Sequence, residues 1–324
     1  MFRIDDSTAV SALPVPEAAG AEGYFTEGNP ATGSPATDVR ASWLNMIQEE
    51  LRAIVVAAGE TPSKTAYTQV LLALQKTFAP IVGAGRNASM LVNGASATGT
   101  FTADEIVLAT ALGAQKFVLP SFSETINLAS TGAGGMDTGA APVSGFVALY
   151  AIYNPSTQAA ALLATDASSA VQPNVYGGAH MPSGYTASAL ISIWPTDGSG
   201  QLAPGYQRDR KVYFSSAQVL NTSTQQASLT SFSMAAAVPK NAKACDGIIN
   251  ATFTTAGAGV NASLAATASG IGKKGFSTVA AASAGQESQS FEDMPIIASQ
   301  TGYYAFITTS GSSTLTISAE AFSF

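Results

Sequence analysis

The sequence predicts a mainly β protein with a small N-terminal α-helical hairpin, followed by tandem antiparallel β-sandwich modules of jelly-roll type. Helical periodicity is confined to residues 36–82. From residue 83 onward, short segments rich in Val, Ile, Phe and Tyr alternate with Gly, Pro, Asn and Ser turns. Only 11% of the residues are charged whereas 46% are hydrophobic, and the mean hydropathy is +0.21. So few charges leave much surface to be covered by neutral polar groups or by other copies of the chain.

The first 35 residues predict an extended arm. Four prolines, Pro14, Pro16, Pro30 and Pro35, stand among Ala, Gly and Glu, and proline favours irregular or extended chain over helix and sheet. An arm that does not fold on itself is expected to pack on something else, and a floppy arm that packs on nothing is the alternative.

Residues 36–82 predict a helical hairpin. Apolar residues recur at helical spacing in two stripes, namely Val39, Trp43, Ile47, Leu51, Ile54 and Val55, and then Tyr67, Val70, Leu71, Leu74 and Phe78. Gly59 is expected to end the first helix, and the second is expected from about Thr65 to Phe78, before Pro80. One hairpin cannot bury both stripes. We therefore expect the core of an oligomer to be formed by Trp43, Ile47, Leu51, Leu71 and Leu74.

Two β-rich modules are expected after the hairpin, at residues 83–215 and 216–324, with a boundary near residues 215–225. In the first module the sequence predicts strands at 116–119, 125–128, 145–153, 189–194 and 211–214. In the second it predicts strands at 228–234, 245–255, 260–267, 275–281, 291–298, 303–308 and 314–322. Such a number of strands matches a complete sandwich.

Charge and hydropathy exclude several classes of partner. The formal net charge is -7 and the 14 Lys and Arg residues form no run, so a phosphate-binding basic patch is not expected and nucleic acid is excluded as a partner. The acidic start, residues 1–6, lacks the apolar core of a secretory signal. The longest apolar runs, 54–58 and 146–153, fall far short of the ~20 residues that span a bilayer. The sequence predicts a soluble protein without membrane insertion.

Catalytic, metal and cofactor sites are not predicted. His180 is the only histidine, which excludes a multi-histidine metal site within one chain, although three copies around an axis could still share an ion. The single cysteine, Cys245, is expected to be a buried apolar residue. The acid pairs Asp104-Glu105 and Glu292-Asp293 could serve a glycosidase only if distant carboxylates met across a sugar, because neighbours on a strand face opposite sides. We interpret both pairs as solvated charge.

Two further features are a cluster of glycines and a set of aromatic residues near turns. The glycine cluster 132–139 lacks the Gly-Lys-Ser/Thr ending of a phosphate loop and is expected to be a flexible loop. Aromatic rings in turn-rich surroundings can stack on sugars. The candidates are Tyr176, Tyr185, Trp194, Tyr206, Tyr303 and Tyr304. Of these, Tyr303 and Tyr304 are the candidate receptor contacts, although burial in the β core is the alternative for each.

Several stretches together resemble a known family. They are 24–33 (YFTEGNPATG), 43–51 (WLNMIQEEL) and 61–64 (TPSK), and then 132–139 (GAGGMDTG), 145–155 (GFVALYAIYNP) and 176–182 (YGGAHMP). The first three resemble the N-terminal module of tail fibres from phages and prophages of Burkholderia- and Pseudomonas-like hosts, over most of residues 24–75. The last three are similar to a central module of the same fibres.

This resemblance implies a trimeric fibre in the virion, synthesised in the cytoplasm of a bacterial host. It implies that three copies of the chain pack about one axis, that the N-terminal end attaches to tail or baseplate proteins, and that the C-terminal end is distal. The expected function is structural and adhesive, with a bacterial surface glycan or pilus as receptor. Two alternatives stay open: a spacer whose host contact is made by another protein, and a polysaccharide depolymerase.

Overall fold

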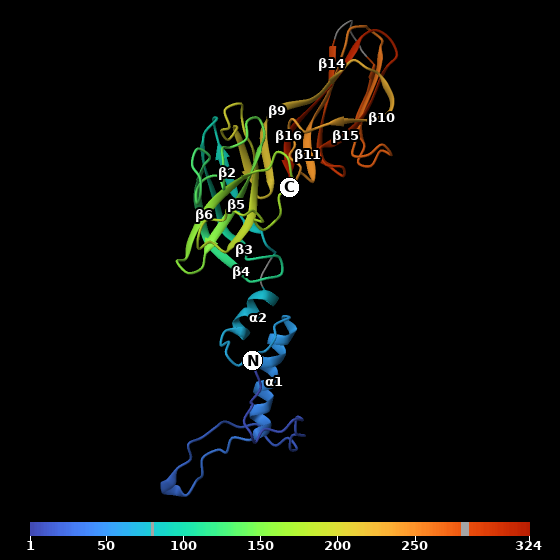
Figure 1. Cartoon of the computed structure of the whole chain (residues 1–324). Coiled ribbons are helices and arrows are strands. Elements are labelled where there is room, and N and C mark those ends of the chain that lie inside the picture. The colour runs from blue at the N-terminus through green and yellow to red at the C-terminus, as the bar shows by residue number, and fades with distance from the viewer. Residues whose placement is uncertain (79–80, 280–284) are drawn as a thin grey trace. The chain divides into compact units, whose positions relative to one another are not determined.

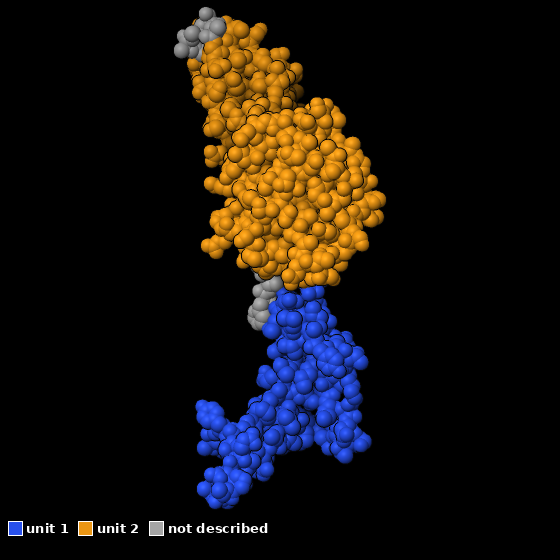
Figure 2. Space-filling view, turned by 90° about the vertical axis from the view of Figure 1, so that its left-hand side faces the viewer, with its two compact units in different colours: residues 1–80, 113–115 blue, residues 81–112, 116–324 orange. Residues whose placement is uncertain are grey.

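The computed structural model describes residues 1–78, 81–279 and 285–324 of the chain (Figure 1). The chain divides into two compact units, shown in different colours in Figure 2. Unit 1 comprises residues 1–80 and 113–115, and unit 2 comprises residues 81–112 and 116–324. The described residues are mainly antiparallel β-strand, with α-helix confined to unit 1. This confirms the predicted fold class.

Unit 1 holds the predicted helical hairpin. Helix α1 (Ala41–Ala57) begins after the extended residue Arg40, and Gly59 follows its end with a φ of 75°, a left-handed conformation that suits glycine. Helix α2 (Gln69–Phe78) contacts α1. A short 3-10 helix, η1 (Pro30–Thr32), lies in the otherwise irregular arm, as the prolines predict.

Helix α2 begins four residues later than the sequence predicts. The side chain of Gln69 donates a hydrogen bond of 2.8 Å to the carbonyl of Thr61 and accepts one of 2.9 Å from the backbone N–H of Ser63. These two bonds hold the preceding segment in a compact turn.

The described residues of unit 2 form two sheets. The larger sheet has a path of ten strands, in the spatial order β14 (Gly285–Pro295), β11 (Ala244–Phe253), β16 (Ser313–Ser323), β9 (Lys211–Thr222), β8 (Gly205–Arg208), β2 (Ser89–Val92), β3 (Thr98–Ala109), β7 (Ala187–Pro195), β5 (Phe146–Asn154) and β6 (Ala159–Asp166). Two further strands, β1 (Gly85–Arg86) and β4 (Lys116–Asn127), pair with β3. The smaller sheet has the order β10 (Gln226–Ser233), β15 (Thr301–Thr308), β12 (Gly259–Ala265) and β13 (Lys274–Val279).

We call strands β1 to β8 the first half of unit 2 and strands β10 to β16 the second half, with β9 between them. Strands β5 and β7 form the centre of the core in the first half. Both strands consist mainly of apolar residues and are buried along nearly their whole length, as expected of strands covered on both faces. Trp194 on β7 is fully buried, and its indole N–H donates a hydrogen bond of 2.9 Å to the carbonyl of Ala203.

In the second half of unit 2 the two sheets share one apolar core. Along β16 buried and half-buried residues alternate, which is the period of a strand with one face turned to the core. Leu315 and Ile317 from this strand belong to the same buried cluster as Leu264 and Phe306 from the smaller sheet. The opposite face of β16 carries half-buried Thr and Ser residues.

Strand β9 joins the two halves of unit 2. Its first residues, 211–214, pair with β8, and the strand pairs with β16 over residues 211–222. The predicted boundary between residues 215 and 216 therefore falls inside a continuous strand. The assignment of 83–215 and 216–324 as separate modules stays a prediction.

Candidate functional site

Unit 1 exposes apolar side chains on its helices. Within α1, all of which the structure describes, Val55 is the one fully buried residue. Trp43 is 41% exposed, and Leu71 and Leu74 on α2 are also exposed. The other two residues expected at an oligomer core, Ile47 and Leu51, are half-buried. A single chain thus leaves all five of these residues at least partly accessible to another molecule.

The N-terminal arm returns to the helices of its own unit. The ring of Phe25 meets the ring of Trp43 edge to face, with 4.9 Å between the ring centroids. Nearer the N-terminus, the carboxylate of Glu17 accepts a hydrogen bond of 2.8 Å from the hydroxyl of Ser42 on α1. An apolar groove, lined by both arm and helix residues, remains between them.

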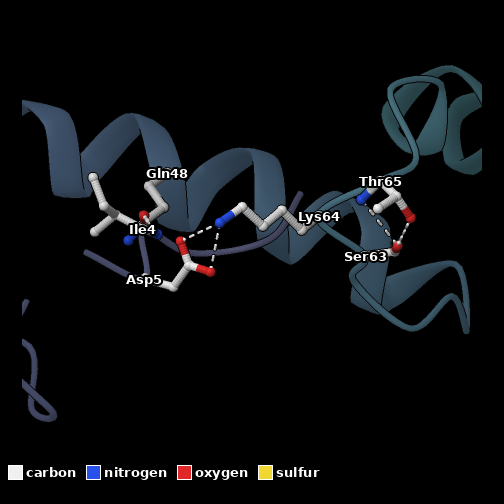
Figure 3. Close-up of polar contacts among 6 residues, drawn as sticks. All are labelled: Ile4, Asp5, Gln48, Ser63, Lys64 and Thr65. Carbon is white, nitrogen blue, oxygen red and sulfur yellow. Dashed lines mark hydrogen bonds and ion pairs between the residues drawn. The ribbon is translucent and has the colours of Figure 1, made fainter. Parts of the chain in front are cut away.

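Exposed polar contacts tie the start of the arm to the helical hairpin. Figure 3 shows the ammonium group of Lys64 between the two carboxylate oxygens of Asp5, 2.7 Å from each, and the backbone N–H of Ile4 donating to Gln48 over 2.7 Å. Arg3 forms a two-pronged ion pair with Glu49, at 2.6 and 2.7 Å. The hydrogen bond from Lys64 lowers the pKa of Asp5, and the hydrogen bond from Arg3 lowers the pKa of Glu49.

Tyr303 and Tyr304, the two candidate receptor contacts, lie in different environments. Tyr304 is only 6% exposed, and its ring packs edge to face on Phe232 in the core. It offers no ring face to a ligand, because alternate residues of β15 point into the core and Tyr304 is one of them. Tyr303 is half-buried and lies opposite Ser231 on β10. Of this pair, Tyr303 alone remains a candidate contact.

The other aromatic candidates divide in the same way. Trp194 and Tyr176 are buried, and Tyr185 packs partly buried against the core. Tyr206 on β8 is 40% exposed and stacks on Tyr213 of β9, which is 37% exposed. Their ring centroids are 6.3 Å apart and the ring planes differ by 21°. Sequence reasoning singled out Tyr206 but missed Tyr213, because only the pairing of β8 with β9 brings the two rings together.

An ion pair lies beside the stacked tyrosines. Lys211 on β9 pairs with Asp246 on β11, and the Lys211 ammonium lies 5.4 Å from the centroid of the Tyr213 ring. The backbone N–H of Asp293 donates to the Asp246 carboxylate over 2.8 Å. Chiefly through the hydrogen bond to Asp246, the pKa of Lys211 is raised. We call the set of Tyr206, Tyr213, Lys211 and Asp246 the tyrosine platform.

The residues weighed for catalysis are not gathered into a site. His180 is exposed, and Asp104 accepts a hydrogen bond of 2.5 Å from the side chain of Asn87. Among residues 1–78, 81–279 and 285–324, no cluster of three or more His, Cys, Asp or Glu side chains could hold a metal ion. Cys245 is fully buried, as expected, and burial raises its pKa to about 12.

The glycine-rich segment 132–139 was expected to be a flexible loop, but backbone hydrogen bonds tie it to β6. The N–H of Gly134 donates to Leu162 over 2.7 Å, and the N–H of Ala164 donates to Gly135 over 2.9 Å. A Cβ on Gly135 would lie 2.4 Å from the carbonyl oxygen of Ser130, so glycine is required by close packing rather than for mobility. The segment is a loop, as expected, but these bonds hold it to β6.

Within the part of the chain that the structure describes, no helix combines the length and the apolar character needed to cross a membrane.

No protein-family model matches the sequence. A crystal structure of a Bacillus thuringiensis Cry1Da tryptic core variant aligns with 78% of this chain and 54% of its own, at 8% identity and a TM-score of 0.19, a likeness too low to carry an argument. Over 75 residues the chain is 44% identical to the Escherichia coli (strain K12) protein named "Uncharacterized protein StfP". That similarity spans 23% of this chain and 34% of the relative, so the chain matches about a third of the relative's length.

Proposed function

We propose that this chain is a structural and adhesive subunit of a bacteriophage tail fibre. Unit 1 holds several copies together and attaches them to the tail or baseplate, and unit 2 faces the bacterial surface. The observation that carries this proposal is the surface of unit 1, where helices α1 and α2 expose Trp43, Leu71 and Leu74. Several exposed large apolar side chains on two short helices favour a surface that binds another protein chain.

Association of copies would bury these side chains. Helices of a bundle pack against one another through their apolar stripes. A hairpin of two helices is too small to bury the apolar stripes of both helices by itself. The resemblance of residues 24–75 to tail-fibre N-terminal modules supports three copies about an axis. It also supports attachment through the arm and a place for the protein in the virion.

A non-catalytic role fits the rest of the chain. Only 11% of the residues are charged, and in the described part of the chain no three His, Cys, Asp or Glu side chains gather as they would to hold a metal ion. Adhesion by a fibre needs no single tight site, because weak contacts repeated over several copies add up to avidity. We therefore assign the host contact to the surface of unit 2.

Sedimentation velocity of the full chain at micromolar concentration tests the assembly. We expect a particle of three chains of 32.7 kDa each. The double variant Leu71→Ser and Leu74→Ser should sediment as a smaller species, because polar side chains remove the apolar contact. Leu112→Ser, at an exposed leucine of unit 2, is the matched control and should leave the assembly intact. A compact monomer of the unsubstituted chain would refute the proposal.

Binding of the labelled full chain to bacterial cells tests adhesion. We expect retention on host cells and competition with adsorption of the phage. Cells that neither retain the protein nor lose phage adsorption would assign it the role of a spacer. Release of oligosaccharide from host surface glycan would assign it the role of a depolymerase.

A further inference from the structure

We propose that the tyrosine platform on unit 2 is a binding site for a neutral pyranose unit of a surface glycan. This inference rests on the proposed adhesive function, since it names the chemistry that such a contact would recognise. It places the contact on strands β8, β9 and β11 of the larger sheet.

The two tyrosines offer an apolar surface that water can reach. Tyr206 and Tyr213 stack across β8 and β9, and each leaves more than a third of its surface exposed. Leu91, the partner of Tyr206 on β2, is exposed as well. Tyrosine combines a flat apolar body with a polar hydroxyl, so it can contact the C–H face of a sugar ring and bond its edge.

The polar half of the site lies on the same face of the sheet. Tyr213 is paired in register with Ala321 on β16, and Ala321 is paired with Asp246 on β11. Directly paired residues of neighbouring strands point to the same side. Ala321 itself is buried, and Tyr213 and Asp246 flank it on that face of the sheet.

The ion pair supplies both a donor and an acceptor. The ammonium of Lys211 donates hydrogen bonds, and the carboxylate of Asp246 accepts them. One oxygen of Asp246 already accepts from the N–H of Asp293, which fixes the carboxylate in place. Adjacent hydroxyls on a pyranose act as donor and acceptor together, so they match a fixed pair of this kind.

Charge selects a neutral sugar over an acidic one. Lys211 and Asp246 cancel each other, and the negative charge of the exposed Asp293 is offset by the exposed Arg208, the partner of Lys211 on β8. The platform thus carries no net charge that would attract a carboxylate or phosphate on the ligand. Stacked tyrosines also stabilise the pairing of β8 with β9, but this role alone would not require the ion pair next to them.

The site is tested directly by measuring the binding of methyl pyranosides to the full chain with saturation-transfer NMR. The probes are the methyl glycosides of glucose, galactose, mannose, N-acetylglucosamine and rhamnose, with methyl glucuronide as the acidic counterpart. At least one neutral glycoside should bind, and the glucuronide should bind more weakly. Absence of binding by every neutral probe, or preference for the glucuronide, would overturn the proposal.

Substitutions then locate the bound sugar. Tyr213→Val should weaken binding about tenfold, because it removes the ring while keeping a side chain that suits a strand. Tyr213→Phe should keep most of the affinity, and Asp246→Asn should lower it. Tyr67→Ala, at an exposed tyrosine of unit 1, is the matched control. Unchanged binding by both Tyr213→Val and Asp246→Asn would place the sugar elsewhere. If Tyr213→Val fails to fold, the conservative variants Tyr213→Phe and Asp246→Asn still test the site.

The sugar assay and the cell assay fail independently. If cells retain the Tyr213→Val and Asp246→Asn variants as well as the unsubstituted chain, adhesion stands and the platform is wrong. If pyranosides bind at the platform and no cell retains the protein, the platform stands and the adhesive function is wrong.

Discussion

The phenol of Tyr176 donates a hydrogen bond of 2.7 Å to the carboxylate of Asp137. This bond joins the glycine-rich segment 132–139 to the loop that precedes β7. A Cβ on Gly178 would lie 2.3 Å from the phenol oxygen, so a glycine is needed for the phenol to reach its partner. Burial, followed by the bond to Asp137, raises the pKa of Tyr176 to about 12. Two loops without regular structure are thereby held to the core.

Tyr176→Phe removes this bond while keeping the ring. We expect the free energy of unfolding to fall by about 1–2 kcal/mol, because a hydrogen bond to a charged acceptor is lost. Tyr150→Phe is the matched control: its phenol donates to the uncharged carbonyl of Pro173 over 2.8 Å, so its loss should cost less, about 1 kcal/mol. Urea unfolding measures both variants. The assignment is wrong if Tyr176→Phe is as stable as the unsubstituted protein.

Buried acidic protons make unit 2 sensitive to alkali. The pKa of Cys245 and that of Tyr176 are each raised to about 12, from ordinary values of 9.0 and 10.0. A raised pKa means that the stabilisation is complete below the ordinary value and is lost as pH rises toward the folded value. Stability should thus fall above about pH 9, by at most about 1.4 kcal/mol per pH unit for each group.

The burial of Cys245 can be tested separately. A thiol reagent should label Cys245 only after unfolding; rapid labelling of the folded protein at neutral pH would contradict its burial.

Acid should release the start of the arm from the helices. The lowered pKa values of Asp5 and Glu49 mean that their ion pairs are present above the ordinary values of 3.8 and 4.5 and are lost as pH falls below them. Trp43 packs on Phe25 of the arm, and the other tryptophan, Trp194, is buried, so a fluorescence change below about pH 4 reports on Trp43. Salt should have a similar effect, because exposed ion pairs are screened. A Trp43 signal that is constant from pH 7 to pH 3 would argue against the arm contacts.

Gly247 lies where β11 is bulged between its neighbours. A Cβ there would come within 1.9 Å of the carbonyl oxygen of Ser318 on β16. Gly247→Ala should destabilise the protein by about 1–3 kcal/mol through this overlap. Gly94→Ala is the control, since nothing lies within 4 Å of its added Cβ, and it should change stability little. Equal melting temperatures for the two variants would contradict the close packing.

Deletion of residues 1–35 should separate attachment from assembly. The exposed apolar residues of α1 and α2 remain in the shortened chain, so we expect it to stay an oligomer in sedimentation experiments. It should no longer join virions, because the arm is absent. Fibres visible by electron microscopy on particles assembled with the shortened chain would refute this prediction.

The sequence predicts the helices and most strands because their periods are strong. The continuous apolar run of 146–153 predicts the buried strand β5, and Gly59 predicts the end of α1. Strand β3 (Thr98–Ala109) was not predicted, since its Thr, Ala, Asp and Glu residues give little apolar signal. Its strand structure depends on pairing with β4 along its length, and long-range pairing overrides weak local preference.

The candidate sites were less predictable than the fold. Tyr304 is named beside Tyr303 as a candidate contact, with burial as the alternative, because the sequence does not reveal which of two adjacent tyrosines faces the core of a strand. The tyrosine platform draws on β8, β9 and β11, which come together only through sheet pairing. Spacing along the chain cannot show that Lys211 meets Asp246.

Strand β9 also bears on how the protein melts. It hydrogen-bonds to β8 in the first half of unit 2 and runs beside β16 in the second half. Because one ladder of bonds passes from one half to the other, separating the halves breaks bonds in both. Heating should therefore produce a single calorimetric transition for unit 2, in which the two cores lose their order together.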